Sequence, residues 1–314
     1  MNFQDFKRKW DDIPQEIGIM QLVSMDSKLW FSRDFKSRKT LTYSSEVLPH
    51  FENRSEAFEI LIADLNGKWQ ISIFLKNEKE KDVFIYFLWD LYESVMNLHD
   101  DEQINLRLRK RVIEWSKLFE FRKNYLSLES LVGLFGELYF IKDKLFEIYG
   151  VEESIRGWRG PLGEDQDFVF NQNWFEVKTI RFGKEKVNIS SIEQLDRTDI
   201  GSLIVFEVEK SNYSVENTIG IRSLINDILY SISDNLSVLY EFERKLILLG
   251  YKDDEYYNDS IYLVKRARDY TVTNTFPRIR RESIDVEILN TNYTLSLSGI
   301  ERFRGDIYAT AYSV

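Results

Sequence analysis

The first part of the chain alternates apolar and polar positions in short runs, and then changes to helical periodicity. Alternating or β-rich runs predict strands over residues 17–23, 29–32, 40–43, 58–63 and 69–74. Asn66-Gly67 stands between the last two runs, and this dipeptide between β-rich segments predicts a tight hairpin. Apolar residues then recur at helical spacing over residues 81–96, and a long polar helix follows over about 101–124. We interpret residues 1–124 as an N-terminal, β-rich α+β domain for recognition or assembly.

The second part, residues 125–314, opens on a helix. Ser127 is a plausible N-cap, and an apolar stripe follows it at helical spacing: Leu131, Leu134, Phe135, Leu138 and Ile141. Short strands are predicted over 167–170 and 174–179 around a turn at 171–173, with further strands over 201–207, 261–264, 284–288 and 293–297. Helices are predicted over about 217–232 and 236–249. This order predicts an α/β fold, α+β overall, in which helices flank a mixed sheet.

The composition excludes several kinds of catalytic and metal-binding site. The 314 residues include no cysteine and only two histidines, which excludes thiol nucleophiles, cysteine-ligated zinc and three-histidine metal sites. The formal net charge of −10 argues against a protein that coats nucleic acid non-specifically. The polar N-terminus and the lack of an apolar run of about 18 residues predict a cytoplasmic protein without a membrane partner.

Charged residues in the paired strands at 167–179 carry the candidate chemistry. Side chains alternate across a strand, so Phe175 and Val177 face one side while Glu176 and Lys178 face the other. A hairpin through 171–173 would bring Asp167 near Glu176 or Lys178. Two carboxylates about 4 Å apart repel by roughly 4 kcal/mol at an effective dielectric near 20. A hard cation such as Mg²⁺ relieves that repulsion, and a neighbouring lysine can position or activate an attacking water.

This pattern resembles the motif of the PD-(D/E)XK nuclease superfamily. Asp167 and the run Glu176-Val177-Lys178 correspond to the acids and the lysine of that motif, although Gln166 replaces the proline before the aspartate. The superfamily has a mixed sheet with flanking helices, and a preceding helix often supplies another acid. Glu137, in the run 133–138, fits that role, and Gly133 one turn earlier leaves the backbone open to close approach.

The chain is similar also to one bacterial family of PD-(D/E)XK motif proteins. The shared landmarks, in chain order, are residues 133–138, 158–161, 166–168, 176–179, 189–195 and 276–278. The resemblance implies a Mg²⁺-dependent endodeoxyribonuclease, with Mn²⁺ as a substitute. It also implies the cleavage subunit of a restriction-modification or phage-defence system, acting on double-stranded DNA beside a DNA methyltransferase or an ATPase. A homodimer is expected by analogy, because cutting both strands usually takes two active sites.

The expected site has a core and a periphery. Asp167, Glu176 and Glu137 would hold the metal, Lys178 would assist the water, and Gln194 would act as a further catalytic residue. Asp165 or Glu164 remain alternatives to Asp167. Contacts with DNA are expected from Arg159, Ser191 and Arg278, and from two basic clusters: Arg107, Arg109, Lys110 and Arg111, and Arg278, Arg280 and Arg281.

Plainer interpretations stand beside these. Asp167, Glu176 and Lys178 also fit an exposed sheet face with a cross-strand ion pair, Ser191 a helix start, and Trp158 core packing instead of a DNA groove. At the level of function, the rival is a non-catalytic subunit with the nuclease fold that binds DNA or a partner protein. A nuclease for RNA or single strands is a third candidate. No phosphate loop of the GxxxxGK type occurs, so any ATP hydrolysis must come from another protein.

Overall fold

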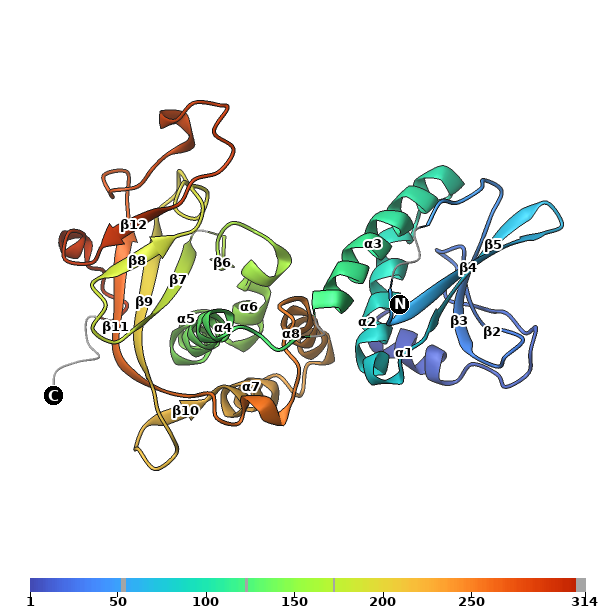
Figure 1. Cartoon of the computed structure of the whole chain (residues 1–314), viewed down its shortest axis with the longest axis horizontal. Helices are drawn as coiled ribbons and strands as arrows, with labels where there is room; N and C mark the ends of the chain where they lie inside the picture. The colour runs from blue at the N-terminus through green and yellow to red at the C-terminus, as the bar shows by residue number, and fades with distance from the viewer. Residues whose placement is uncertain (52–54, 122–123, 172, 309–314) are drawn as a thin grey trace. The chain divides into compact units, whose positions relative to one another are not determined.

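The computed structural model of the chain describes residues 1–51, 55–121, 124–171 and 173–308 (Figure 1). The chain divides into two units, Met1–Tyr125 and Leu126–Val314. In the part of the chain that is described, no helix is long and apolar enough to cross a membrane.

The N-terminal unit is a five-stranded antiparallel sheet with helices packed against it. The strands follow the order β1-β2-β3-β5-β4. Their bounds are β1 Gln21–Leu22, β2 Leu29–Arg33, β3 Lys39–Ser45, β4 Phe58–Leu65 and β5 Lys68–Leu75. The helices are α1 Phe3–Asp11, the 3-10 turn η1 Glu78–Glu80, α2 Lys81–Val95 and α3 Asp101–Phe121.

The hairpin between β4 and β5 is the one that the sequence predicts. Leu65 pairs with Lys68, so Asn66 and Gly67 form a two-residue turn. Their φ angles of 57° and 82° are both positive, as a type I′ turn requires. Asparagine and glycine adopt this conformation at the lowest cost, which explains why the dipeptide fixes the position of the turn.

Aromatic side chains make the core of the N-terminal unit. Phe6 of α1 packs edge-on against Phe31 of β2 and Trp89 of α2, with ring centroids 5.0 and 5.2 Å apart. Below them, buried Asp90 accepts hydrogen bonds from Trp115 Nε1 at 2.8 Å and from the Arg111 guanidinium. Arg111, one of the basic residues expected to contact DNA, is therefore bound inside the unit, whereas Arg107, Arg109 and Lys110 are exposed on α3.

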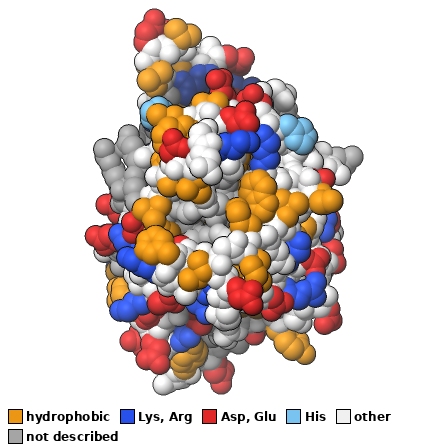
Figure 2. Space-filling model, turned by 90° about the vertical axis from the view of Figure 1, so that its right-hand side faces the viewer, with side chains coloured by type: hydrophobic (Ala, Val, Ile, Leu, Met, Phe, Trp, Pro, Cys, Tyr) orange, Lys and Arg blue, Asp and Glu red, His pale blue; other side chains and the backbone are white. Residues whose placement is uncertain are grey.

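One face of the molecule, shown in Figure 2, mixes apolar side chains with charges of both signs. Several large apolar side chains of the N-terminal unit are exposed, among them Ile17, Met25, Phe35 and Leu65. Among the described side chains visible on that face, lysine and arginine alternate with aspartate and glutamate and form no continuous basic surface. This face therefore lacks the uniform positive potential that sequence-independent binding of DNA phosphates uses.

The C-terminal unit is built on a second five-stranded sheet, in the order β10-β11-β9-β7-β6. β7 and β9 run parallel, and the other neighbours are antiparallel, so the sheet is mixed as predicted. A separate two-stranded sheet pairs β8 with β12. The strand bounds are β6 Phe168–Val169, β7 Trp174–Arg181, β8 Lys186–Ile189, β9 Gly201–Lys210, β10 Thr218–Gly220, β11 Ile261–Val272 and β12 Tyr293–Ser296.

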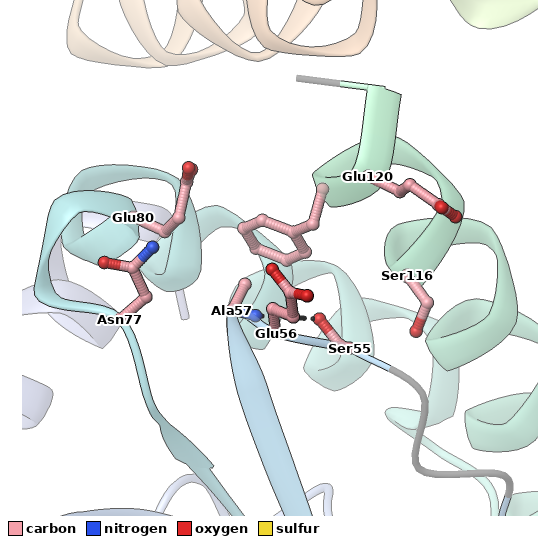
Figure 3. A pocket seen from close by; sticks show the side chains of 8 residues that line it. Ser55, Glu56, Ala57, Asn77, Glu80, Ser116 and Glu120 are labelled. Atoms are coloured by element: carbon pink, nitrogen blue, oxygen red, sulfur yellow. Dashed lines mark hydrogen bonds between the residues drawn. The ribbon is translucent and has the colours of Figure 1, made fainter. Parts of the chain in front are cut away.

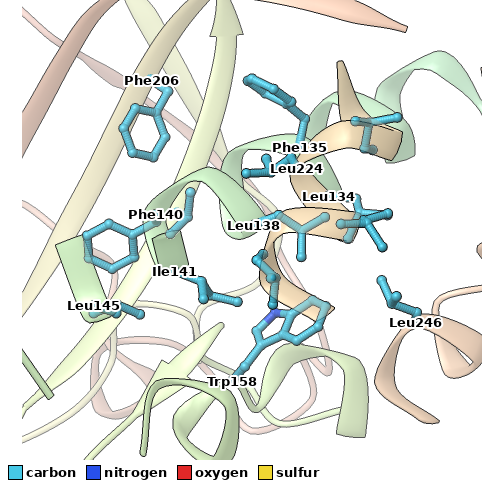
Figure 4. Packing of buried hydrophobic residues seen from close by; sticks show 14 of the residues in the cluster. Leu134, Phe135, Leu138, Phe140, Ile141, Leu145, Trp158, Phe206, Leu224 and Leu246 are labelled. Atoms are coloured by element: carbon cyan, nitrogen blue, oxygen red, sulfur yellow. The ribbon is translucent and has the colours of Figure 1, made fainter. Parts of the chain in front are cut away.

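Helices cover one face of this sheet, and β8 and β12 cover the other. Phe175 and Val177 of β7 join the core beneath α4, α7 and α8, part of which Figure 4 shows. Trp174 joins a second core beneath β8 and β12. The helices are α4 Leu128–Phe140, the π-helical turn η2 Ile141–Leu145, α5 Phe146–Tyr149, α6 Val151–Gly157, α7 Ile221–Ser231 and α8 Leu236–Leu248. Short 3-10 turns are η3 Gly160–Leu162, η4 Glu255–Tyr257, η5 Arg281–Ser283 and η6 Glu301–Phe303.

Several predicted elements differ from the structure, and three of them are as follows. The helix expected from about residue 217 begins at Ile221, because residues 218–220 pair with β11 as β10. The strand expected over 17–23 is only Gln21–Leu22. The strand expected over 284–288 is wrong: this segment has no strand partner, and the Arg281 side chain donates to the carbonyl oxygen of Ile288 at 2.6 Å.

Candidate active site

The short hairpin of β6 and β7 places the motif residues. Phe168 pairs with Phe175, so Asp167, one residue before β6, lies beside Glu176. The alternation of β7 sends Phe175 and Val177 into the helix-covered core. Glu176 and Lys178 consequently lie on the opposite face of the sheet, toward β8 and β12.

The acids and the lysine contact one another through short polar interactions. Asp167 Oδ2 accepts a hydrogen bond from the backbone N–H of Val177 at 2.8 Å. Lys178 Nζ lies 2.7 Å from Glu176 Oε1 and donates to Gln194 Oε1 at 3.1 Å. Gln194 Oε1 also accepts from the Ser190 N–H at 2.8 Å. Gln194 therefore fixes the loop after β8 to the lysine ammonium.

Glu137 reaches this group from helix α4. The indole Nε1 of Trp158 donates to Glu137 Oε2 at 2.6 Å. Trp158 is fully buried and packs against Phe242 of α8, so core packing is the interpretation that holds for it (Figure 4). Its only polar atom thus orients an acidic side chain of the candidate site.

A close approach between α4 and β7 carries Glu137 to the strand. A Cβ atom added to Gly136 would lie 1.8 Å from Thr179 Oγ1 and 3.1 Å from Thr179 Cβ. The same atom added to Gly133 would meet nothing within 4 Å. The glycine that permits the close contact with β7 is therefore Gly136, while the space beside Gly133 is open.

This contact predicts opposite effects for two similar substitutions. Gly136→Ala should lower the free energy of unfolding by about 1–3 kcal/mol, because rotation of Thr179 does not relieve the approach to its Cβ. Gly133→Ala is the control, and it should raise stability by about 0.5–1 kcal/mol through helix propensity alone. Urea denaturation of both variants measures the difference, and equal effects would contradict the packing described here.

Burial makes the three carboxyl groups hold protons more tightly. Glu176 is 1% exposed, while Glu137 and Asp167 keep part of their surface open. Burial, followed by the charge of Asp167, raises the pKa of both Glu137 and Glu176 well above the usual value. Burial also raises the pKa of Asp167, against the opposing effects of the Lys178 ammonium and the Val177 N–H. The group therefore favours either a bound proton or a cation.

The donor set fits a divalent metal. Neither carboxylate oxygen of Glu176 makes a well-aligned hydrogen bond, and the Lys178 ammonium is its nearest cation. Among the described residues, no three His, Asp or Glu side chains surround one point closely enough to hold an ion as they stand. The reason is visible in the contacts, because Trp158 holds Glu137, the Val177 N–H holds Asp167 and Lys178 faces Glu176. Carboxylate oxygens are the ligands that Mg²⁺ and Mn²⁺ prefer, so the chemistry of the three acids suits such an ion.

A hollow beside the hairpin contains Arg159. The hollow has a volume of about 630 Å³ and is lined by Tyr149, Arg156, Arg159 and Phe170, among others. The backbone N–H of Arg159 donates to the Asp167 carbonyl oxygen at 2.7 Å, which ties this loop to the candidate site. Arg159 Nε is buried without a hydrogen-bond partner, and its Nη1 lies 3.6 Å from exposed Glu164. Asp165, the other alternative ligand, is exposed as well.

The remaining candidates lie in loops. Ser191 follows β8 in a segment that is not helical. The Arg278 guanidinium donates to the carbonyl oxygens of Leu195 and Arg197, the latter at 2.9 Å. Arg281 pairs with Glu193 at 2.5 Å, and Arg280 Nη2 lies 3.3 Å from Asn274 Oδ1. Much of the hydrogen-bonding capacity of this basic cluster is therefore used inside the protein.

Two residues near the site make contacts that the sequence did not predict. Gln166, which replaces the expected proline, is buried and donates to the Glu193 carbonyl oxygen at 2.6 Å. Tyr293 of β12 lies near the acids, and burial together with charges that include Glu176 raises its pKa to about 12. Both contacts join segments far apart in sequence, so no local spacing could have indicated them.

A second hollow, in the N-terminal unit, has the opposite character. It measures about 250 Å³, and Figure 3 shows its lining residues Ser55, Glu56, Ala57, Asn77, Glu80, Ser116 and Glu120. Three glutamates and no basic residue line it. Such a lining repels phosphate, so the candidate site remains the one in the C-terminal unit.

Comparison with known proteins identifies the family of the chain. No curated protein and no solved structure matches the chain. One family model matches residues 14–298, and its description is "Putative PD-(D/E)XK family member, (DUF4420)". The matched range contains the mixed sheet, α4, the β6–β7 hairpin and the acids beside Lys178. The chain therefore belongs to the DUF4420 family and has the nuclease-like fold that this family name denotes.

Proposed function

We propose that this protein is a metal-dependent DNA endonuclease that hydrolyses phosphodiester bonds. The observation that carries the proposal is the convergence of Glu137, Asp167 and Glu176 beside the Lys178 ammonium. Three acids with raised pKa values, of which Glu176 is fully buried, next to a partly exposed lysine, are typical of a functional site more than of an ion pair on a sheet face. Phosphodiester hydrolysis by such a site needs neither cysteine nor histidine.

Each residue has a role that follows from its contacts. Asp167 and Glu176 would hold Mg²⁺ or Mn²⁺, and Glu137 would complete the ligand set. A divalent cation supplies Lewis acidity, which lowers the pKa of water and offsets charge on the phosphate. Lys178 would position the attacking water and stabilise the negative charge that develops on the phosphate oxygens. Gln194 orients that lysine, and the exposed part of the Arg159 guanidinium would contact a neighbouring DNA phosphate.

The biological setting belongs to the same proposal. The family resemblance supports a cleavage subunit of a bacterial restriction-modification or phage-defence system in the cytoplasm. A DNA methyltransferase or an ATPase would be its partner, and two copies would cut the two strands. Ser191, Arg278 and the exposed residues Arg107, Arg109 and Lys110 are further candidates for contacts with DNA phosphates.

The test is cleavage of supercoiled plasmid and phage DNA by the purified full-length chain with Mg²⁺ or Mn²⁺. Wild-type protein should produce nicked or linear DNA, and Asp167→Asn should produce none, because it removes a ligand charge. Asp165→Asn is the matched control, since it makes the same change at an exposed position two residues away. Cleavage that persists in Asp167→Asn would overturn the assignment of the site.

The rival function is a nuclease-fold subunit that binds DNA or a partner without cutting. The acidic balance of the chain favours it. Calorimetry with Mn²⁺ separates the two, because the rival predicts no metal binding that depends on Asp167 and Glu176. Cleavage of RNA or single-stranded DNA in parallel assays would identify a different substrate for the same centre.

A further inference from the structure

A second positively charged cavity lies in the C-terminal unit, apart from the candidate active site. It has a volume of about 650 Å³ and is bounded by β11, the segment before β8 and the segment around η6. Four cationic side chains line it, Lys265, Arg266, Arg268 and Arg304, against two carboxylates, Glu185 and Glu301. The size is that of a site for a small organic ligand.

A bulge in β11 gathers these charges. The pairing of β11 with β9 shifts between Val264 and Arg266, so Lys265 is an extra residue in the strand. A bulge changes the direction of the side chains around it, which allows consecutive residues to reach one side of the sheet. Lys265 lies over the Phe182 ring, and Arg304 over the Tyr270 ring, with 5.6 and 5.5 Å between each charged group and the ring centroid.

The strongest indication of a ligand is Arg268. Its side chain is 9% exposed, and it lines the cavity although the guanidinium carries a full charge. Glu207 of β9 pairs with its Nη2 and lies 3.3 Å from Arg266 Nη1, so one carboxylate serves two guanidinium groups. Arg268 Nε is buried without any hydrogen-bond acceptor. An anion in the cavity would supply the missing negative charge beside this guanidinium.

The charge balance of the cavity also favours an anionic ligand. Glu301 Oε1 lies 3.5 Å from Arg304 Nε, which is a weak ion pair, and Glu185 has an exposed side chain. With Glu207 included, the cationic groups still exceed the acidic groups by one. The N–H groups of a planar guanidinium are spaced so that two of them can donate to two oxygens of one phosphate.

The cavity is distinct from the metal-ligand candidates. Lys178 and Arg268 both pair with Val205 of β9, from opposite sides, so they lie in one row of the sheet two strands apart. Two strand spacings correspond to about 10 Å between their Cα atoms. The fully buried Val205 separates the two positions and packs in the core beneath β8 and β12.

We propose that this cavity binds a phosphate group of a nucleotide-sized ligand through Arg268, Arg304, Arg266 and Lys265. The phosphate can come from a free nucleotide or from the backbone of a nucleic acid, and the chemistry of recognition is the same in both cases. The proposal does not depend on the nuclease activity, because it concerns other residues.

Calorimetric titration of the full-length protein tests the proposal, in EDTA so that no metal bridges the ligand to the acids. Inorganic phosphate, ATP and a short DNA duplex are the three probes. Arg304→Gln removes a partly exposed charge and should weaken phosphate or ATP binding at least about tenfold. Arg302→Gln is the control, because this exposed arginine lies two residues away and does not line the cavity. It should bind as the wild type does.

The probes also identify the source of the phosphate. Binding of phosphate or ATP that weakens in Arg304→Gln supports a free ligand. Binding of the duplex alone, weakened in the same variant and unchanged in Arg302→Gln, supports a nucleic acid backbone. Lys265→Gln, at an exposed position, provides a second variant that does not disturb the buried pair of Arg268 and Glu207. No binding of any probe, or equal binding by wild type, Arg304→Gln and Lys265→Gln, would overturn the proposal.

Discussion

Replacing Lys178 with methionine is expected to lower the rate of DNA cleavage by about 10²–10⁴-fold. The ammonium is the only candidate in the proposed centre that can position the attacking water and also offset developing charge, and groups with these roles contribute factors of that order. Lys186→Met is the control, because Lys186 is an exposed lysine on β8. A plasmid cleavage assay under single-turnover conditions measures both variants.

Metal binding provides the second readout for Lys178→Met. The ammonium lies 2.7 Å from Glu176 Oε1 and so competes with any cation for that oxygen. Mn²⁺ binding should therefore persist in the variant while cleavage is lost. A cleavage rate within about threefold of the wild type would contradict the proposed role, since that loss is far below the range given for such groups.

The metal-free protein is expected to gain stability when Glu176 is replaced with glutamine, although the same change should abolish cleavage. Burial raises the pKa of Glu176 above its usual value of 4.5, so the folded protein binds this proton more tightly than the unfolded chain does. The stability from this group is complete below pH 4.5 and is lost as the pH rises through the raised pKa. Across that interval the free energy of unfolding falls by about 1.4 kcal/mol per pH unit for one such carboxyl.

Chemical denaturation in EDTA, from pH 5 to pH 8, measures this effect as the difference between the variant and the wild type. The comparison is needed because other acids act in the opposite direction. Hydrogen bonds and ion pairs, against burial, lower the pKa of Asp34 and Asp101, whose contributions are lost as the pH falls. Glu209→Gln, on an exposed position of β9, should leave the pH dependence unchanged. A parallel pH dependence in Glu176→Gln and the wild type would show that Glu176 is not the group that releases the proton.

Local chemistry in the sequence accounts for much of the fold. The Asn66-Gly67 turn and the apolar periodicity of α2 predict their elements because the cause lies within a few neighbouring residues. The strands that the sequence did not predict in full depend on partner strands far away in the chain. β8 has only four residues and pairs with β12, about one hundred positions later. β11 extends to Val272 because β9 offers a long edge beyond the four residues that looked like a strand.

The candidate site likewise has one part that local sequence patterns predict and one part that depends on distant contacts. Strand alternation and one short hairpin are enough to bring Asp167 beside Glu176, so spacing alone suggests that pair. The contact between Trp158 and Glu137 spans 21 residues and depends on the path of two helices. Gln166 stands where the superfamily has proline, and its bond to the loop at Glu193 has no counterpart in a local pattern.

Trp158 has a consequence for how this family can diverge. The same indole fills the core between α4 and α8 and fixes a carboxylate of the proposed centre (Figure 4). Phenylalanine at this position would preserve most of the packing but lose the donor, and a smaller polar residue would preserve a donor at the expense of the core. Selection for folding and selection for chemistry therefore act on one side chain. A lineage that gave up cleavage would be freed from only one of these constraints, so its position 158 should drift first toward other large apolar residues.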